Sequence, residues 1–367
     1  MPNNQSTTSQ PSSPVKPRRR LRYPGKHPRR FGEKYKERNP DKYPDTIQKV
    51  LASGKTPAGT HRPICVREIL EILSPRPGEI LVDATLGYGG HAMEILRRIQ
   101  PGGRLIGLDV DLIELSKTEL RLRAAGIPPE VLTVCHSNFA GLPKVLASLG
   151  IQGVDGVLAD LGCSSMQLDD PSRGFSFKIA GPLDLRMNPA KGYSAAAFLA
   201  AAGEEELRRL LHDNSDEPHA ALLARAVIQA RSKKPIQTTQ DLTNIIRDAL
   251  ATLPKQVQAH ERDTPVRRVF QALRIAVNDE FSALDSFLRT LPDCLNPAAR
   301  VVILSFHSGE DRRVKKSFQT GLSQGIYSRI AQEIIRPSSE ELRSNPRSTS
   351  AKLRWAIRNE GLRSVKT

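Results

Sequence analysis

Cysteine is scarce in this sequence, with 4 residues in a chain of 367. None of the four forms a Cys-x-x-Cys pair, and none lies near a histidine at the spacing of a metal site. This excludes a disulfide framework and a structural zinc, and it indicates a reducing compartment. Three of them lie in apolar runs and are expected to be small core residues; the four are Cys65, Cys135, Cys163 and Cys294.

Long apolar runs are also missing. No stretch reaches the length of a membrane span and no secretory core follows Met1, so we expect a cytoplasmic protein without a membrane partner. The absence of acidic residues before Glu33 leaves an organellar transit peptide as an alternative. The many prolines of this region argue against it, because they would break an amphipathic targeting helix.

Acidic residues are outnumbered, and the formal net charge is +16. Residues 1–60 hold 14 Lys and Arg against 4 Asp and Glu, a net of +10, which leaves about +6 for the other 307 residues. This region is rich in Ser and Pro, so we expect a basic, disordered tail that either contacts RNA or serves as a linker. The charge favours nucleic acid as the partner over a membrane surface, with a solvated basic protein as the remaining alternative.

From His61 onward, strand and helix patterns alternate. Apolar residues at spacings of three and four predict helices at 64–73, 91–99, 111–125 and 139–149. Short apolar runs between them predict buried strands at 79–85, 104–109, 131–135 and 154–160. This repetition predicts an α/β fold with a doubly wound parallel sheet.

The alternation stops after Leu161. Residues 164–193 are irregular, and residues 194–253 carry short helix patterns, one of which begins with a capping box of Thr238 and Asp241. One long helix is then predicted from Val266 to Leu291. A strand at 300–306, a basic helix at 310–318 and a last edge strand at 352–358 follow.

This pattern predicts two folded domains. Residues 61–163 and 266–367 are expected to form a Rossmann-like domain, and residues 164–265 an inserted all-helical domain for the substrate.

A glycine-rich turn follows the first predicted strand in the run DATLGYGGH, residues 83–91. Asp109 ends the second strand, where its carboxylate can accept both ribose hydroxyls of a nucleoside, and Asp160 ends the fourth. Phe139 follows the third strand and is either an adenine contact or a core residue. Because ligands of such sheets bind at the carboxyl ends of the strands, these residues predict one crevice.

The crevice favours a cationic ligand. The turn lacks the third glycine of G-x-G-x-x-G, so a nicotinamide dinucleotide is the weaker alternative, and an ordinary strand–helix turn is another. S-adenosylmethionine carries a positive sulfur and no phosphate. Acidic side chains at the strand ends therefore suit this methyl donor better than a dinucleotide.

Residues 155–188, DGVLADLGCSSMQLDDPSRGFSFKIAGPLDLRMN, carry a more specific pattern. Together with the glycine turn, FQALRIAVN (270–278), SFHSGEDRRVKKSF (305–318) and NPRSTSAKLR (345–354), this run resembles the RsmH/MraW family. The resemblance spans about residues 61–358 and leaves the basic tail outside. It implies a Rossmann-like class I S-adenosylmethionine-dependent methyltransferase that acts on N4 of a cytosine, 1402 in the usual numbering, in 16S ribosomal RNA of the small subunit.

The same resemblance implies the cofactor contacts by position. They fall on residues from the turn, the strand ends and the start of the insertion: Gly89, Gly90, His91, Asp109, Phe139, Asp160 and Gln167. No metal is expected, because a sulfonium is already a strong electrophile. Asp160 is the candidate catalytic residue, as a carboxylate that orients either the target amine or the cofactor.

Two stretches depart from the family pattern, at 214–219 and at 264–268. They leave open a paralogue that methylates another RNA, and a non-catalytic RNA-binding factor in ribosome assembly is a further alternative. The sequence also leaves the oligomeric state open, a homodimer included. Candidate phosphate contacts are basic residues near the motifs: Arg173, Lys178, Arg186, Arg312, Arg313, Lys315 and Lys316.

Overall fold

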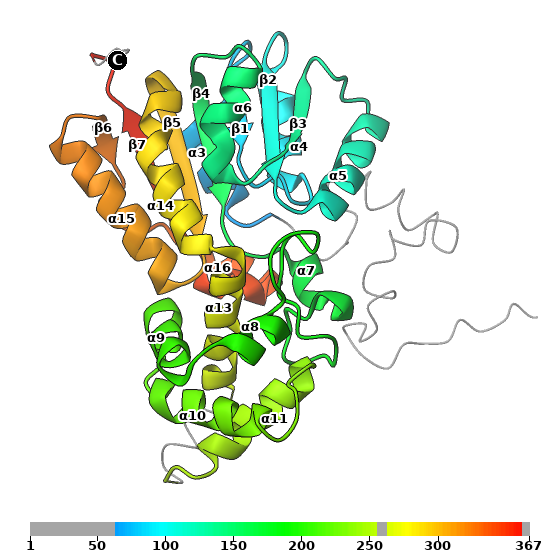
Figure 1. Cartoon of the computed structure of the whole chain (residues 1–367). Coiled ribbons are helices and arrows are strands. Elements are labelled where there is room, and N and C mark those ends of the chain that lie inside the picture. The colour runs from blue at the N-terminus through cyan, green and yellow to red at the C-terminus, as the bar shows by residue number, and fades with distance from the viewer. Residues whose placement is uncertain (1–62, 255–262, 362–367) are drawn as a thin grey trace, which may run out of the picture.

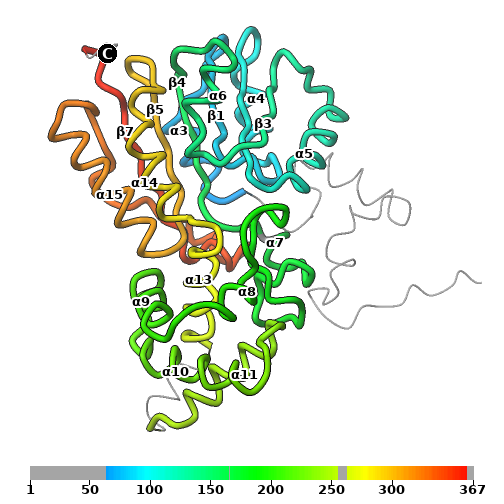
Figure 2. The backbone as a smooth tube through the Cα atoms, in the orientation of Figure 1, coloured from blue at the N-terminus to red at the C-terminus, as the bar shows by residue number. Residues whose placement is uncertain are grey.

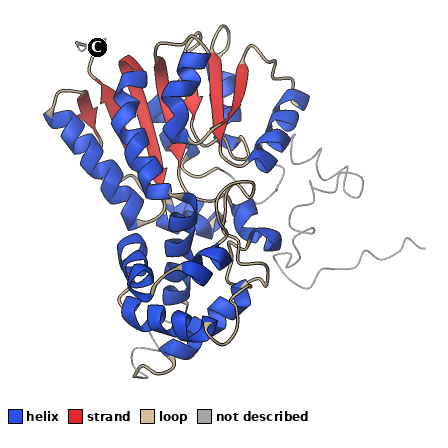
Figure 3. Ribbon diagram, in the orientation of Figure 1, coloured by secondary structure: helices blue, strands red, loops and turns tan. Residues whose placement is uncertain are grey.

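The computed structural model describes residues 63–254 and 263–361. The predicted basic tail at 1–60 lies outside the described residues, as do His61 and Arg62. A seven-stranded sheet lies in one half of the molecule and a group of helices in the other (Figures 1 and 3). Among the described residues, no helix is both long and apolar enough to cross a membrane.

The sheet has the strand order β3-β2-β1-β4-β5-β7-β6, and the first five strands of the chain are parallel. Because they are parallel, their carboxyl ends share one edge of the sheet. The apolar run of β4 is buried from Gly156 to Ala159, as expected for a strand covered on both faces. The strands are β1 Ile80–Asp83, β2 Arg104–Asp109, β3 Leu132–His136, β4 Val154–Asp160, β5 Leu295–Ser305, β6 Tyr327–Ile330 and β7 Lys352–Arg358.

Helices cover both faces of this sheet, which confirms the predicted doubly wound α/β fold. One face packs against α3 Val66–Leu73, α4 Gly90–Ile99 and α5 Leu112–Ala124. The other face packs against α6 Leu142–Ser148, α14 Glu280–Thr290 and α15 Ser308–Ser323. Short 3-10 helices join some elements: η2 Phe139–Gly141, η3 Pro171–Arg173, η4 Leu291–Cys294 and η5 Pro346–Ser350.

The chain leaves the sheet after β4, passes through the helical half and returns through α13 into α14 (Figure 2). The apolar residues of the helical half, from Phe175 to Leu273, form a buried cluster that is separate from the clusters on the sheet. The predicted division into domains at 163/164 and 265/266 stays a proposal; the cluster also includes residues of α13. The helices are α7 Ser165–Asp169, α8 Ala195–Ala201, α9 Glu204–Ser215, α10 Ala220–Arg231, α11 Thr239–Leu250 and α13 Thr264–Asn278.

The prediction of one long helix from Val266 to Leu291 is wrong. The chain breaks into α13 and α14 at Asp279, which has a left-handed φ of 50°. The side chain of Asn278 ties this break to the insertion, since its Oδ1 accepts from the Met187 amide at 2.6 Å and its Nδ2 donates to the Leu185 carbonyl at 2.7 Å. The apolar spacing continues across the break because α13 packs in the helical cluster and α14 against the sheet.

The predicted strand at 352–358 exists as β7, but it is not at the edge. It lies between β5 and β6 and pairs antiparallel with both. The edge strand is β6, which the sequence analysis missed. Its four residues expose Ser328 and Arg329 at the centre, so the strand lacks the apolar run that marked the others.

α16 Ser339–Ser344 and η5 lead into β7. Lys352, the first residue of β7, pairs with Ser305, the last residue of β5. The segment before Lys352 therefore lies at the carboxyl edge of the sheet, and α16 is seen there between the two halves of the molecule (Figure 1).

Candidate cofactor and active site

The turn after β1 is built around glycine. Gly89 is the N-cap of α4 with φ of 70°, and a Cβ there would lie 3.0 Å from Cγ2 of Thr118 on α5. Both facts require glycine at this position. Thr118 also donates from its hydroxyl to the Gly87 carbonyl at 2.6 Å. Thr118 thus holds the turn against α5, at the edge of the sheet where ligands bind.

Asp109, at the end of β2, has a fixed carboxylate. Its Oδ2 accepts from the Gly87 amide at 2.7 Å, and its Oδ1 accepts from the Asp111 amide at 2.8 Å. Burial raises the pKa of Asp109, and these amide donors oppose that rise. Each oxygen keeps a further lone pair, so the carboxylate can still accept from two hydroxyls.

The side chains of His91 and Asp160 lie close together, at the strand edge where the sequence predicts both. Nε2 of His91 lies 3.6 Å from Oδ2 of Asp160. Within the described chain, both His91 Nε2 and Asp160 Oδ1 are buried without a hydrogen-bond partner. The Asp160 backbone is fixed, because its amide donates to the Thr85 hydroxyl at 2.6 Å. Buried polar atoms without partners are rare and indicate a place for an additional group.

Asp83 is a third carboxylate at this edge, and the sequence analysis did not list it as a site residue. It is 2% exposed, and burial raises its pKa to about 7. His91 opposes this rise, whereas Asp160 and Asp109 add to it. The signal was available, since Asp83 ends β1 as Asp109 ends β2 and Asp160 ends β4.

Gln167 is linked to the end of β2 by a hydrogen bond to Asp111. Its Nε2 donates to Asp111 Oδ2 at 2.8 Å, and its Oε1 accepts from the Ser164 amide at 2.8 Å. Ser164 in return accepts from the Gln167 amide, which completes a capping box at the start of α7. Gln167 therefore stands beside the Asp109 corner with its orientation set by the protein.

Phe139 lies on η2 with its ring against Phe287 of α14, at a centroid distance of 5.3 Å and an angle of 63°. The side chain is half-buried and packs at the margin of the core. This is the core interpretation that the sequence left open. A contact with an adenine ring stays a prediction.

Several of the basic residues that were candidates for phosphate binding are ion-paired inside the protein. Arg173 is buried and contacts Asp111 at 2.8 Å. Three others pair with carboxylates at 2.7 to 3.3 Å: Arg186 with Asp184, Arg312 with Asp216 and Arg313 with Asp285. The prediction of a phosphate contact is therefore wrong for Arg173, whose guanidinium is enclosed.

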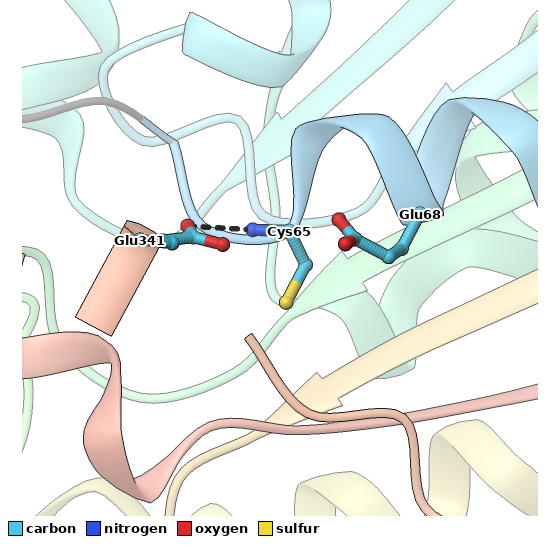
Figure 4. Close-up of side chains that lie close together, drawn as sticks. All are labelled: Cys65, Glu68 and Glu341. Carbon is cyan, nitrogen blue, oxygen red and sulfur yellow. Dashed lines mark hydrogen bonds between the residues drawn. The ribbon is translucent and has the colours of Figure 1, made fainter. Parts of the chain in front are cut away.

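Two side-chain groups in the described residues have the composition of a metal site. In the first, Cys65 and Glu68 of the α3 region face Glu341 of α16 (Figure 4). Burial raises the pKa of the Cys65 thiol to about 12, so it stays protonated at neutral pH. Glu341 is also engaged inside the protein, since its Oε1 accepts from the Cys65 amide at 2.9 Å.

The second group is Glu280, His307 and Glu310. Arg274 donates to both oxygens of Glu280 at 2.8 and 2.9 Å, and His307 lies 3.2 Å from Glu310. These carboxylates are already matched by positive or hydrogen-bonding partners. The chemistry of both groups therefore fits internal contacts better than a cation.

The crevice itself fits a nucleoside with a positive sulfur. Asp109 offers a bidentate acceptor for ribose, and the turn at Gly89 allows close approach of backbone. Asp160 offers a buried oxygen without a partner, which a cation or an amine would satisfy. Within the described residues, no lysine or arginine is bonded to the side chain of Asp109 or Asp160.

Two proteins of known family have sequences similar to nearly the whole of this chain. Ribosomal RNA small subunit methyltransferase H 1 of Lachnoclostridium phytofermentans is 50% identical over 359 residues, covering 97% of this chain and 98% of the relative. Ribosomal RNA small subunit methyltransferase H 2 of Alkaliphilus metalliredigens is 52% identical over 344 residues, covering 94% and 98%. The first match extends into residues 1–60, which corrects the expectation that this segment lies outside the resemblance. Both relatives are bacterial, which lends no support to a transit peptide.

The family model of the MraW methylases matches residues 58–359. This range contains the glycine turn, all three strand-end carboxylates and the helical half. S-adenosylmethionine is the methyl donor of such enzymes, so the predicted cofactor is confirmed with the fold class. With this match and relatives at about half identity, the chain belongs to the MraW methylase family.

Proposed function

We propose that this protein methylates N4 of a cytosine in 16S ribosomal RNA, at the position usually numbered 1402. The names of the relatives support ribosomal RNA of the small subunit as the substrate. The observation that carries the chemistry is Asp160, whose buried Oδ1 has no partner among the described residues at the end of β4. An exocyclic amine is a donor that such an oxygen can accept from.

The residues that would hold the cofactor are those that the family pattern predicts: Gly89, Gly90, His91, Asp109, Phe139, Asp160 and Gln167. Bound S-adenosylmethionine supplies a methyl group on a positive sulfur. Asp109 and the Gly89 turn would fix the nucleoside, and His91 would hold the Asp160 carboxylate through Oδ2.

Asp160 has the task of preparing the nucleophile. The lone pair of a cytosine amine is delocalised into the ring, so the amine is a poor nucleophile while it is planar. By accepting one amine hydrogen at Oδ1, Asp160 would turn the lone pair towards the methyl carbon. Asp160 or water would accept the proton that N4 gives up once it has taken the methyl group, whose bonding electrons would stay with the cofactor sulfur. Alignment of this kind supplies much of the acceleration in group transfer.

Cys163 follows in the same loop, and burial raises the pKa of its thiol to about 12. A thiol that stays protonated is a weak nucleophile, so a covalent route like that of carbon-5 methylation is disfavoured. This supports an amine as the target.

The two stretches that depart from the family pattern contact each other. Gln271 donates to the Asn214 carbonyl at 3.1 Å, Asn214 donates to the Ala272 carbonyl at 3.2 Å, and Arg268 lies 3.7 Å from Glu217. The 214–217 segment and the start of α13 therefore form one packing unit. The departures therefore lie in internal packing contacts and leave the residues at the strand ends unchanged, which is compatible with the usual target.

The target base must leave its stack to reach the carboxyl edge of the sheet, so we expect a single-stranded or flipped cytosine. The partner is the small ribosomal subunit, and the place of action is the cytoplasm, where these subunits are assembled.

The test is transfer of tritiated methyl groups to small subunits that lack this modification, followed by nucleoside mapping. We expect one labelled nucleoside, N4-methylcytidine, at the named position. Label at another nucleotide would favour the paralogue. Binding of subunits without transfer would favour the assembly factor and overturn the proposal.

A further inference from the structure

The motif NPRSTSAKLR, residues 345–354, contributes no residue to the proposed cofactor site. Its first eight residues, 345–352, belong to the segment 336–352, which contains α16 and η5 and which we call the α16 strap. Through the pairing of Lys352 with Ser305, the strap lies at the carboxyl edge of the sheet, where the target base must arrive.

The strap is attached on both sides of the crevice. On one side, Oε1 of Glu341 accepts from the Cys65 amide at 2.9 Å, as the dashed line in Figure 4 shows. On the other side, Arg347 donates to both oxygens of Asp169, at 2.6 and 3.2 Å. Cys65 is the N-cap of α3, and Asp169 ends α7 at the start of the helical half. The strap thus joins the two halves of the molecule.

Electrostatic interactions link the strap to the residues of the proposed active site. Burial is the main cause that raises the pKa of Cys65, and the carboxylates of Glu341, Glu68 and Asp160 add to it. Burial also raises the pKa of Glu341, and His91 opposes that rise. The carboxylate of Glu341 therefore lies near the His91 imidazole, and that of Asp160 near the Cys65 thiol.

Three cations of the strap have no carboxylate partner among the described residues. Arg336 and Arg343 are exposed, and their only partners in the described residues are backbone carbonyls, those of Ala351 and Ser339. Lys352 is half-buried and has no carboxylate partner there. By contrast, Arg173, Arg186, Arg312 and Arg313 are ion-paired within the protein.

We propose that the α16 strap binds the sugar–phosphate backbone of the RNA strand that carries the target base, through Arg336, Arg343 and Lys352. Guanidinium groups without carboxylate partners can form paired hydrogen bonds with phosphate oxygens. Because the strap is anchored through Glu341 and Arg347, the backbone that carries these cations is held at a fixed place relative to Asp160. This inference rests on the proposed function, since it takes RNA as the substrate.

The experiment measures the affinity of the full-length protein for purified small subunits at several salt concentrations, by filter binding. Substitution of Arg336 and Arg343 together by Ala should reduce the slope of log affinity against log salt by about 1.4, from ~0.7 per lost phosphate contact of single-stranded RNA. The double substitution to Lys should keep the slope, because the charges remain. The matched control is Arg76→Ala with Arg289→Ala, two exposed cations that precede β1 and β5 and so lie at the opposite edge of the sheet.

Calorimetry with S-adenosylhomocysteine and thermal unfolding check that the variants fold and keep the cofactor site. The inference is overturned if the double Ala variant keeps the wild-type slope, or if the control pair changes the slope equally. Failure of the proposed function looks different. In that case the wild type transfers no methyl group, while its RNA affinity still depends on the strap.

Discussion

Arg173 donates from Nη1 to Oδ2 of Asp111 at 2.8 Å, and the two side chains are 9% and 1% exposed. Asp111 follows the end of β2 and caps α5 by accepting from the Ile113 and Glu114 amides. Nη2 of Arg173 donates to the carbonyls of Arg186 and Met187. One buried ion pair therefore connects the Asp109 corner of the crevice to the helical half.

Replacement of Arg173 by Ala should destabilise the protein strongly. It leaves the Asp111 carboxylate buried without its cation, a change that costs about 3–5 kcal/mol. Urea unfolding measures the loss. The control is Arg208→Ala, whose pair with Glu205 is 44% and 57% exposed, so solvent screens it and its loss should destabilise the protein far less. Equal losses of unfolding free energy in the two variants would show that the buried pair contributes no more to stability than the exposed pair.

Gly89→Ala should impair both stability and cofactor binding. A left-handed backbone costs a non-glycine residue about 1–2 kcal/mol, and the new methyl would also lie 3.0 Å from Thr118 Cγ2. Gly150 has a similar φ of 66° with nothing within 4 Å of its Cβ position, so Gly150→Ala isolates the backbone cost. We expect Gly89→Ala to lower the free energy of unfolding more than Gly150→Ala does. Only Gly89→Ala should weaken the binding of S-adenosylhomocysteine, measured by calorimetry. Wild-type affinity in that variant would argue against a close approach of ligand to the turn.

Asp83 should make stability fall as the pH rises. Burial raises its folded pKa to about 7 from the ordinary 3.8, so the folded state holds a proton that the unfolded state releases. Its contribution is fully present below pH 3.8 and is lost as the pH rises to about 7, at up to ~1.4 kcal/mol per pH unit. Asp83→Asn should flatten this dependence in urea unfolding between pH 5 and 8. Parallel pH curves for the two proteins would contradict a protonated Asp83.

Asp160→Asn should separate chemistry from binding. The amide keeps the shape of the side chain but removes the negative charge that accepts and orients the amine, so we expect kcat to fall by about 10²–10⁴. Affinity for S-adenosylhomocysteine should change far less, by calorimetry. Full turnover in single-turnover transfer to small subunits would remove Asp160 from the mechanism.

The parallel strands were predictable because each is covered on both faces. β2 and β4 begin and end at the predicted residues, since their apolar runs are continuous and stop at Asp109 and Asp160. The capping box of Thr238 and Asp241 is confirmed for the same kind of reason, because its contacts are local.

Features that depend on distant contacts could not be predicted. The side chain of Asp111 accepts from Arg173, 62 positions away, so no local pattern indicates that this arginine is enclosed. The break at Asp279 depends on Asn278 holding the loop at Leu185, 93 positions earlier. The assignment of individual residues to the cofactor stays a prediction, because it comes from the family pattern and no bound ligand tests it.

The position of β7 has a consequence for synthesis on the ribosome. The strand that separates β5 from β6 comes last in the described chain, so β5 keeps an open hydrogen-bonding edge until residue 358 has emerged. The apolar cluster of the helical half is complete by Leu273 and can collapse earlier. A nascent chain paused near residue 330 would therefore combine a packed helical half with an unpaired strand, the state in which aggregation and chaperone capture are most effective.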